Sequence, residues 1–309
     1  MAYASISKPS LHFNTKLFTG DGTTSNSITG VGFQPDWVWI KSRNHTNVHS
    51  VYDAVRGIYK RIQTNQTNAE YAEPGAVKAF DSDGFTLGNW TSVNGSGHSQ
   101  VAWNWKANGS GSSNTDGSIT STVSANTTSG FSIVSYTGTG ATATVGHGLG
   151  VAPKMVFYKN RTDVTHWYCI TTAIDGSVDL IHLNLADAEG GGSSFTAPTN
   201  SLLNLTSSND INGSGDNIIA YCFAEKKGYS KFGSYTGNNN ADGPFIYTGF
   251  KPAFVIIKRT DSTNNWGLFD NKRNPDNPVN KLILPNVNNA EDGNNTRIDM
   301  YSNGFKPRV

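Results

Sequence analysis

Two acid–arginine motifs are the most distinctive charged groups in the sequence. Asp53 is followed three residues later by Arg56, and Asp270 is followed at the same spacing by Arg273. A carboxylate and a guanidinium this close along the chain can form a charge-assisted pair, which either fastens a turn or offers a polar ligand two complementary groups. We expect the first role. The sequence therefore predicts two structural ion pairs.

The remaining acids do not form a pattern for sugar hydrolysis. That chemistry needs two carboxyl groups facing one cleft, and acids at positions i and i+2 of a strand would share one sheet face. None of the five glutamates lies on an expected strand with a second acid two residues later, and Glu70 and Glu73 fall in an expected solvated loop. No serine or cysteine has a suitable base beside it in the sequence. We expect no enzymatic activity.

Metal ligands are also poorly placed in the sequence. The closest histidine pair is His45 and His49, which lacks the third ligand that zinc needs. Residues 81–84 (Asp-Ser-Asp-Gly) resemble the start of a calcium loop, but the later acidic ligands are missing, so a turn held by Asp side chains is favoured. No metal ion and no cofactor are expected.

Three tryptophans are candidates for binding a sugar. Trp90, Trp167 and Trp266 stand beside Asn, Thr or His in expected loops or strand ends. An exposed indole among amide groups is compatible with a shallow glycan site. The alternative is burial, because a tryptophan in a β-sandwich commonly belongs to the core. We keep all three as candidate ligand-binding residues.

Composition argues against several partners. The chain has 309 residues, only 15% of them charged, and a net charge of +1, so it offers no basic surface for nucleic acid. No apolar run is long enough to cross a membrane, and no secretory signal is visible near the start, so neither is expected. Cys169 and Cys222 allow one disulfide at most, and burial as small side chains is favoured.

The sequence contains three copies of one unit. Each copy has a proline six residues before a lysine, at 35–41, 153–159 and 252–258. The first two copies are 118 residues apart (35 to 153), and the next two are 99 apart (153 to 252). An aromatic-Thr-Gly triplet precedes each copy, at 18–20, 136–138 and 235–237. Such a fixed register indicates tandem repetition of one structural module.

The third copy ends before its last expected strand. An Asn-Gly-Ser-Gly turn occurs at 94–97 and 212–215, and by the same spacing its third counterpart would fall near position 311, beyond Val309. The counterpart of the apolar segments 101–105 and 218–223 is therefore missing. An unpaired sheet edge recruits other chains unless it is covered. We expect the third unit to be either completed by a partner segment or cut short.

The pattern between these landmarks predicts an all-β protein. Apolar runs such as 37–40 are bounded by Gly, Pro and Lys, as in strands covered on both faces. Short segments separated by Gly-containing turns indicate antiparallel sheets. We predict three tandem antiparallel β-sandwich units of the jelly-roll or lectin-like kind, the third incomplete. The expected boundaries are 1–107, a flexible linker at 108–114, 115–229 and 230–309.

Several segments resemble a known family. They are ITGVGFQPDWVWIK (28–41), FDSDGFTLG (80–88), VGHGLGVAPK (145–154) and AYCFAE (220–225). Over essentially the whole chain the sequence is similar to tandem-repeat virion structural proteins of tailed bacteriophages of marine bacteria. The resemblance implies a tail-fibre-like or surface-displayed component of the particle, and it implies no catalytic residues.

The sequence thus favours a non-enzymatic virion structural protein that contacts host-surface glycan. A purely architectural head-decoration or fibre-shaft protein that binds other virion proteins is the alternative, and a polysaccharide depolymerase comes third. The expected partners are other virion proteins and host polysaccharide, with neither nucleic acid nor membrane insertion. A homo-oligomer is expected because the third unit is open.

Overall fold

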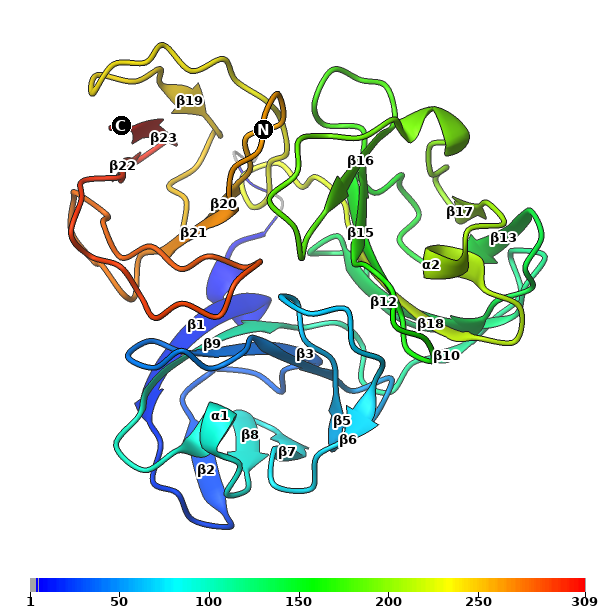
Figure 1. The fold of residues 1–309 in the computed structure, drawn as a ribbon, viewed down its shortest axis with the longest axis horizontal. Helices are drawn as coiled ribbons and strands as arrows, with labels where there is room; N and C mark the ends of the chain where they lie inside the picture. Colours follow the sequence, from blue (N-terminus) through cyan, green and yellow to red (C-terminus); the bar gives the residue numbers. More distant parts are fainter. Residues whose placement is uncertain (1–3, 5, 309) are drawn as a thin grey trace.

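The computed structural model describes residues 4 and 6–308, which form mainly short antiparallel strands and the turns between them. The predicted all-β, sandwich-like fold is confirmed. The three repeats form three lobes arranged around a common centre (Figure 1). We call them lobe 1, lobe 2 and lobe 3 in chain order.

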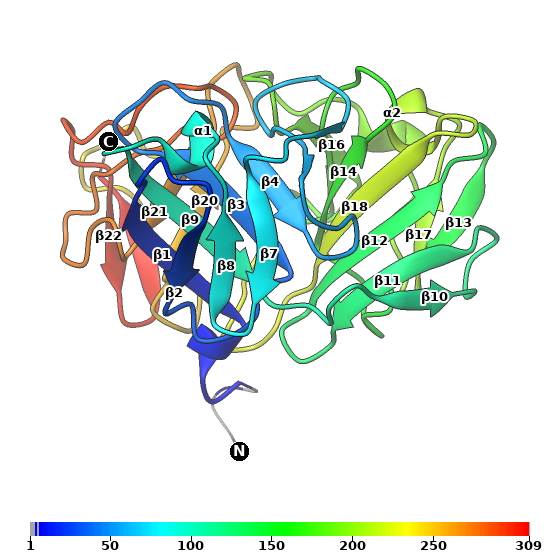
Figure 2. The ribbon, with the colours of Figure 1, turned by 90° about the horizontal axis from the view of Figure 1, so that it is seen from below.

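Lobe 1 has two layers. Its inner sheet has the order β1-β9-β3-β4 and its outer sheet the order β2-β8-β7, which lies over the inner sheet in Figure 2. The inner strands are β1 (Phe13–Thr19), β3 (Trp37–Ser42), β4 (Ser50–Asp53) and β9 (Ser99–Trp105). The other elements are η1 (Pro9–Leu11), β2 (Asn26–Thr29), β5 (Lys60–Arg61), β6 (Tyr71–Ala72), β7 (Val77–Asp81), β8 (Gly84–Leu87) and α1 (Thr91–Asn94).

Lobe 2 repeats this plan with extra strands at both edges. Its inner sheet has the order β10-β11-β12-β18-β14-β15-β16, and β13 and β17 form the outer layer. The inner strands are β10 (Ser112–Asn114), β11 (Ser121–Asn126), β12 (Phe131–Thr137), β14 (Met155–Asn160), β15 (Tyr168–Thr171), β16 (Asp179–His182) and β18 (Asn217–Phe223). The other elements are β13 (Ala143–Gly146), η2 (Gly192–Ser194), β17 (Leu202–Leu205) and α2 (Asn209–Asn212).

Lobe 3 keeps a reduced inner sheet. Among the described residues it consists of β20 (Phe254–Ile257) and β21 (Gly267–Asp270), which correspond to β3 and β4 of lobe 1. The outer sheet is complete, with the order β19-β23-β22. Its strands are β19 (Ile246–Tyr247), β22 (Ile298–Tyr301) and β23 (Gly304–Pro307).

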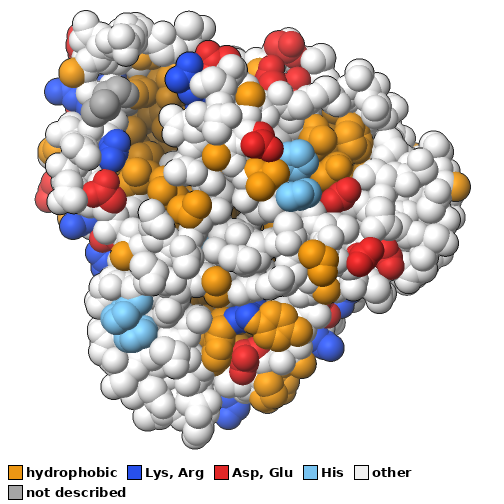
Figure 3. Space-filling view, viewed as in Figure 1, with side chains coloured by type: hydrophobic (Ala, Val, Ile, Leu, Met, Phe, Trp, Pro, Cys, Tyr) orange, Lys and Arg blue, Asp and Glu red, His pale blue; other side chains and the backbone are white. Residues whose placement is uncertain are grey.

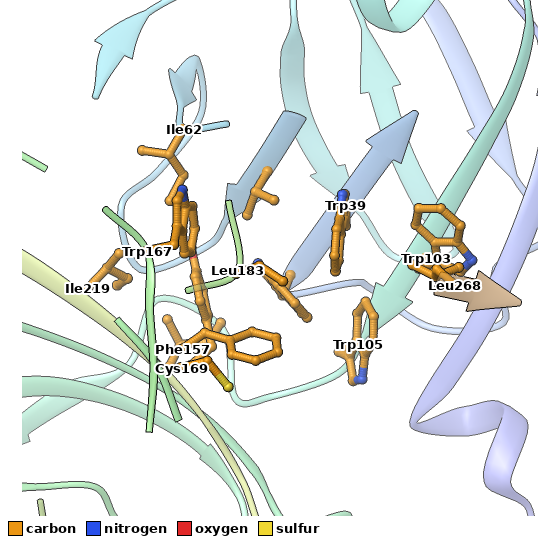
Figure 4. Packing of buried hydrophobic residues seen from close by; sticks show 14 of the residues in the cluster. Trp39, Ile62, Trp103, Trp105, Phe157, Trp167, Cys169, Leu183, Ile219 and Leu268 are labelled. Atoms are coloured by element: carbon orange, nitrogen blue, oxygen red, sulfur yellow. The ribbon is translucent and has the colours of Figure 1, made fainter. Parts of the chain in front are cut away.

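The inner sheets of all three lobes share one central core. Lobe 1 contributes Trp39 and Trp103, lobe 2 contributes Trp167 and Tyr221, and lobe 3 contributes Trp266 to one cluster of buried side chains, part of which is shown in Figure 4. Three further clusters fill the space between the inner and outer sheets of the individual lobes. The lobes are therefore parts of one body and share their hydrophobic stabilisation.

This arrangement explains the uninterrupted apolar runs. All six residues of β3 are buried. Trp37 and Trp39 face the central core, whereas Val38 and Ile40 face the core of lobe 1. Successive side chains of a strand point to opposite faces of the sheet. A strand covered on both faces therefore carries apolar residues on both faces and shows no alternation of apolar and polar residues.

The segment 108–114, expected to be a flexible linker, is instead fastened to both neighbours. The amide of Asn108 donates to Ser124 Oγ at 2.8 Å, and the amide of Gly109 donates to Asp36 Oδ1 at 3.2 Å. Residues Ser112–Asn114 form β10, which pairs with β11. Gly, Ser and Asn are typical of linkers, but they also suit tight turns. Gly109 has a positive φ, which glycine adopts without steric cost.

Candidate functional site

The two predicted acid–arginine pairs are confirmed. Arg56 Nε lies 2.5 Å from Asp53 Oδ2, and Arg273 Nε lies 2.6 Å from Asp270 Oδ2, with all four side chains fully buried. The backbone amide of each arginine also donates to the other carboxylate oxygen, at 2.8 Å and 2.9 Å respectively. Each pair therefore fastens the turn that follows the edge strand of the inner sheet, β4 in lobe 1 and β21 in lobe 3.

The pair of lobe 1 is also the centre of the contact with lobe 2, which we call interface 1–2. Glu70 accepts hydrogen bonds from Arg56 at 3.0 Å and from Arg161 of lobe 2 at 2.8 Å. Tyr221 of β18 donates its hydroxyl to Asp53 at 2.6 Å. Burial alone would raise the pKa of Glu70, but the hydrogen bond from Arg161 and the charge of Arg56 hold that pKa below its ordinary value. The expectation that Glu70 belongs to a solvated loop is wrong, because its carboxylate joins two lobes.

Interface 3–1, between lobe 3 and lobe 1, repeats the same network. Glu291 accepts hydrogen bonds from Arg273 at 3.1 Å and from Arg43 of lobe 1 at 2.8 Å. Trp103 of β9 donates its indole N–H to Asp270 at 3.0 Å. In both interfaces an aromatic residue from the long central strand of one lobe completes the buried charge network of its neighbour.

Interface 2–3, between lobe 2 and lobe 3, lacks this network. In lobe 2, Thr171 and Ile174 occupy the positions of Asp53 and Arg56. In lobe 3, Thr260 occupies the position of the bridging arginines, Arg43 and Arg161. Glu189 still donates its amide to the carbonyl of Thr260 at 2.8 Å. The backbone contact and its glutamate are therefore kept, whereas the Asp–Arg pair and the bridging arginine are replaced by uncharged residues.

A wide groove opens at interface 2–3. It encloses about 1550 Å³, which exceeds the roughly 300–1,000 Å³ typical of small-molecule pockets. One wall is β20 and the other is the segment 230–236, the counterpart of β1 and β12. Hydrophobic side chains gather in this hollow in Figure 3. It is lined by six partly buried side chains that pack against the central core: Phe13, Met155, Ile174, Phe223, Phe254 and Ile256.

Backbone groups along both walls of the groove are open to pairing. Within residues 4 and 6–308, β20 pairs only with β21, and residues 231–236 belong to no strand. Ser234 anchors this second wall to lobe 2 through a hydrogen bond from its hydroxyl to the carbonyl of Ile174, 2.6 Å long. The groove therefore presents an unpaired sheet edge above exposed parts of the central core.

Two of the three candidate sugar-binding tryptophans are core residues. Trp167 and Trp266 are 0% and 2% exposed. Their indole N–H groups donate to the carbonyl oxygens of Gln63 in lobe 1 and His182 in lobe 2, at 2.7 Å and 3.0 Å. His49 is the equivalent residue of lobe 1. This position fastens one lobe to the next, so the expectation that Trp167 and Trp266 stack on a glycan is wrong.

Trp90 lies apart from the other two, at the outer side of lobe 1. It is half-buried and packs against the core of that lobe. The guanidinium of Arg61 lies 3.8 Å from one indole ring centre of Trp90 and 4.1 Å from the ring of Tyr71. This cation–π stack occupies the ring face that a sugar would use. The three tryptophans are not brought together into one site.

Sequence reasoning missed the residues that join the lobes. Glu70 and Glu291 hold the same position in lobes 1 and 3, and each meets an arginine two residues after a repeat lysine, Arg43 or Arg161. The recurrence of Glu at equivalent repeat positions was the available signal. The pairing across lobes could not be read without knowing that the lobes close around a centre.

Comparison with known proteins identifies the family. A family model described as a domain of unknown function, DUF7483, matches residues 8–309. The chain belongs to this family. The match spans all three lobes, so the family is defined by the whole body and not by one repeat. Neither the curated proteins nor the solved structures gave a significant match.

Other kinds of chemistry find little support in the described residues. Across residues 4 and 6–308, no three His, Cys, Asp or Glu side chains gather closely enough to hold a metal ion. Asp83, in the calcium-like segment, accepts hydrogen bonds from the amides of Gly30 and Gly32. Cys169 and Cys222 are buried free thiols, and burial raises the pKa of Cys222 to about 12. No helix in this part of the chain is long and apolar enough to cross a membrane.

Proposed function

We propose that this protein is a non-enzymatic structural component that assembles with other proteins. The observation that carries the proposal is that the three lobes share one buried core. Buried acid–arginine networks also join lobe 1 to both of its neighbours.

The commitment of four buried acids to ion pairs supports a structural role over catalysis. The carboxylates of Asp53 and Asp270 are committed to buried arginines, and Glu70 and Glu291 bridge lobes. A catalytic acid or base must reach a substrate proton, which these buried and fully partnered groups cannot do without opening an interface.

The resemblance to bacteriophage virion proteins supports a place on a virus particle, and we propose an architectural role there, as a decoration or fibre component. The tryptophans no longer support contact with host glycan. Trp167 and Trp266 are buried, and the guanidinium of Arg61 covers one face of the Trp90 ring.

Analysis of purified particles tests this function. Particles are purified by density gradient from an infected culture that carries the coding sequence, and their proteins are counted by mass spectrometry. We expect the protein at a fixed number of copies per particle. Its absence from particles, specific binding on a glycan array, or release of reducing ends from host polysaccharide would each favour another function.

A further inference from the structure

We propose that lobe 2 binds a calcium ion beside interface 2–3, in a pocket between β16 and the glycine-rich loop 189–193, with the carboxylates of Asp179 and Glu189 as its charged ligands. The open pocket has a volume of about 490 Å³ and is lined by residues 177–179, 189–193 and Phe195. The inference goes beyond the proposed function and does not depend on it. The sequence-based expectation of no metal ion rested on other residues, the histidines and the segment 81–84.

Glu189 holds the same repeat position as Glu70 and Glu291 but lacks their arginines. The amides of all three glutamates donate to a carbonyl of the next lobe, at 2.7 or 2.8 Å. The carboxylates of Glu70 and Glu291 each meet two arginines. At Glu189 the two arginine positions are occupied by Ile174 and Thr260. Interface 2–3 therefore keeps the glutamate and has lost both of its cationic partners.

A third basic position is replaced by an acid in the same pocket. The strand register places Asp179, which is opposite Thr171, at the same position as Lys60 in lobe 1 and Lys281 in lobe 3. The two lysines are equivalent, because the arginine of each buried pair donates to the carbonyl of its lysine, at 2.8 Å and 2.7 Å. The charge at this position is therefore reversed in lobe 2.

Asp179 is buried and has one carboxylate oxygen without a partner. The residue is 7% exposed. Within residues 4 and 6–308, its Oδ2 atom has no hydrogen-bond partner. Burial of a charged oxygen without a partner is costly. Because Asp179 lines the pocket, a cation bound there satisfies this oxygen.

The two carboxylates of the pocket also disfavour each other's charged form. Burial raises the pKa of Asp179, and the nearby carboxylate of Asp175 raises it further. Burial also raises the pKa of Glu189, and the charges of Asp179, Asp175 and Asp261 add to that rise. A divalent cation opposes each of these effects, because it stabilises the ionised carboxylates.

The donor atoms of the pocket fit calcium. Besides the two carboxylates, its lining offers the carbonyl oxygens of three consecutive glycines, 190–192, and the hydroxyls of Ser177 and Ser193. Calcium accepts about six to eight oxygen ligands in flexible geometry, including backbone carbonyls and water, whereas magnesium demands a stricter octahedron. Two carboxylates are fewer than the three His, Cys, Asp or Glu side chains of a preformed metal cluster. Carbonyl groups and water therefore complete the coordination shell.

The glycine-rich loop leaves room for the ion. A Cβ atom added to Gly190 or Gly191 would have a single atom within 4 Å, at 3.8 Å and 3.7 Å respectively. A Cβ atom added to Gly192 would overlap the carbonyl oxygen of Val178. The loop is thus pressed against the start of β16 at Gly192 and open at the two preceding glycines.

Ion binding is coupled to the contact between lobes 2 and 3. The amide of Glu189 donates to the carbonyl of Thr260 in lobe 3. An ion that fixes the carboxylate of Glu189 also fixes the loop that makes this contact. Calcium therefore performs at interface 2–3 the task that arginines perform at the other two interfaces.

Calcium titration of the full chain tests the inference, after treatment with a chelator and dialysis. Calorimetry should show one site with a dissociation constant of about 0.1–1 mM, the range of weak calcium modules, and binding of Mg²⁺ should be roughly tenfold weaker. The melting temperature should rise with added Ca²⁺. Neither heat nor a shift at about 10 mM Ca²⁺, or equal effects of Ca²⁺ and Mg²⁺, would overturn the proposal.

Matched variants test the two charged ligands. Asp179→Asn and Glu189→Gln each keep the shape of the side chain and remove one charge, so each should weaken Ca²⁺ binding roughly tenfold or more. Asp187→Asn is the control, because Asp187 is exposed and does not line the pocket. It should bind Ca²⁺ as the wild type does. Equal weakening in all three variants would overturn the assignment of the ligands.

A charge reversal provides a second test that does not require loss of stability. Asp179→Lys installs the residue type found at this position in lobes 1 and 3, beside Glu189. It should abolish Ca²⁺ binding and raise the melting temperature of the calcium-free protein toward that of the calcium-loaded wild type. Unchanged Ca²⁺ binding in Asp179→Lys would overturn the proposal, whether or not the protein is found in purified particles.

Discussion

Interface 1–2 and interface 2–3 use the same backbone contact and opposite chemistry. The amide of Glu70 donates to the carbonyl of Arg161, and the amide of Glu189 donates to that of Thr260, each at 2.8 Å. Around the first contact lies a buried network of acids and arginines completed by Tyr221. Around the second lies an open apolar groove.

Buried charges occur where a strand of the neighbouring lobe covers them, β18 in interface 1–2 and β9 in interface 3–1. In interfaces 1–2 and 3–1 the strand of a neighbouring lobe covers the Asp–Arg pair and donates a hydrogen bond to it. In interface 2–3, Thr171 and Ile174 replace the pair, and among residues 4 and 6–308 no strand covers this position. A buried carboxylate without its full set of partners is strongly destabilising, so uncharged residues suit a position that has no donor beside it.

The largest effect should follow from removing one charge at interface 1–2. Arg56→Met leaves Asp53 buried without its cation and should lower the free energy of unfolding by about 3–5 kcal/mol. Ile174→Met changes the equivalent residue of interface 2–3 with little change of volume and should cost less than about 1.5 kcal/mol. Urea denaturation of both variants measures the difference, and equal losses would contradict the comparison.

A smaller effect is expected from the aromatic donor. Tyr221→Phe removes one hydrogen bond to the carboxylate of Asp53 and should cost about 1.5–3 kcal/mol of unfolding free energy. A double-mutant cycle with Asp53→Asn isolates the contribution of this contact, because the remaining packing is common to all four proteins. A coupling energy near zero would show that the donor is incidental to the interface.

The smallest effect concerns the pH dependence of stability. Burial lowers the pKa of Lys159 to about 8, whereas an unfolded lysine titrates near about 10.4. Between these values the unfolded chain binds more protons, so stability should rise with pH, by about 1.5 kcal/mol from pH 8 to 9.5. Lys159→Met should flatten this rise more than Lys258→Met, because Lys258 is only partly buried at the open interface. Urea titrations at several pH values measure both slopes, and an unchanged slope in Lys159→Met would contradict the assignment.

Much of the fold could be predicted from local patterns. The repeat register, the apolar runs and the Gly-rich turns led to the all-β sandwich units, and the spacing of Asp53 and Arg56 led to their ion pair. These features depend on residues close together in the chain. They do not depend on how the lobes are arranged.

The features that could not be predicted depend on contacts between lobes. Trp167 has polar neighbours in the sequence, which favoured an exposed indole ring. Its indole N–H instead donates to the carbonyl of Gln63, 104 residues away. Glu70 and its partner Arg161 are 91 residues apart. An apolar run such as 37–40 indicates that both faces of the strand are buried. It does not indicate that one of these faces packs against another repeat.

The shared central core restricts which substitutions the sequence can accept during evolution. Inward side chains of all three repeats belong to one buried cluster, so a replacement in one copy must be tolerated by its neighbours at the same time. Transplanting a single repeat from a homologue should fail where moving all three together succeeds. The single repeat was the unit of duplication, but the whole three-lobed body is the unit that can be exchanged between proteins.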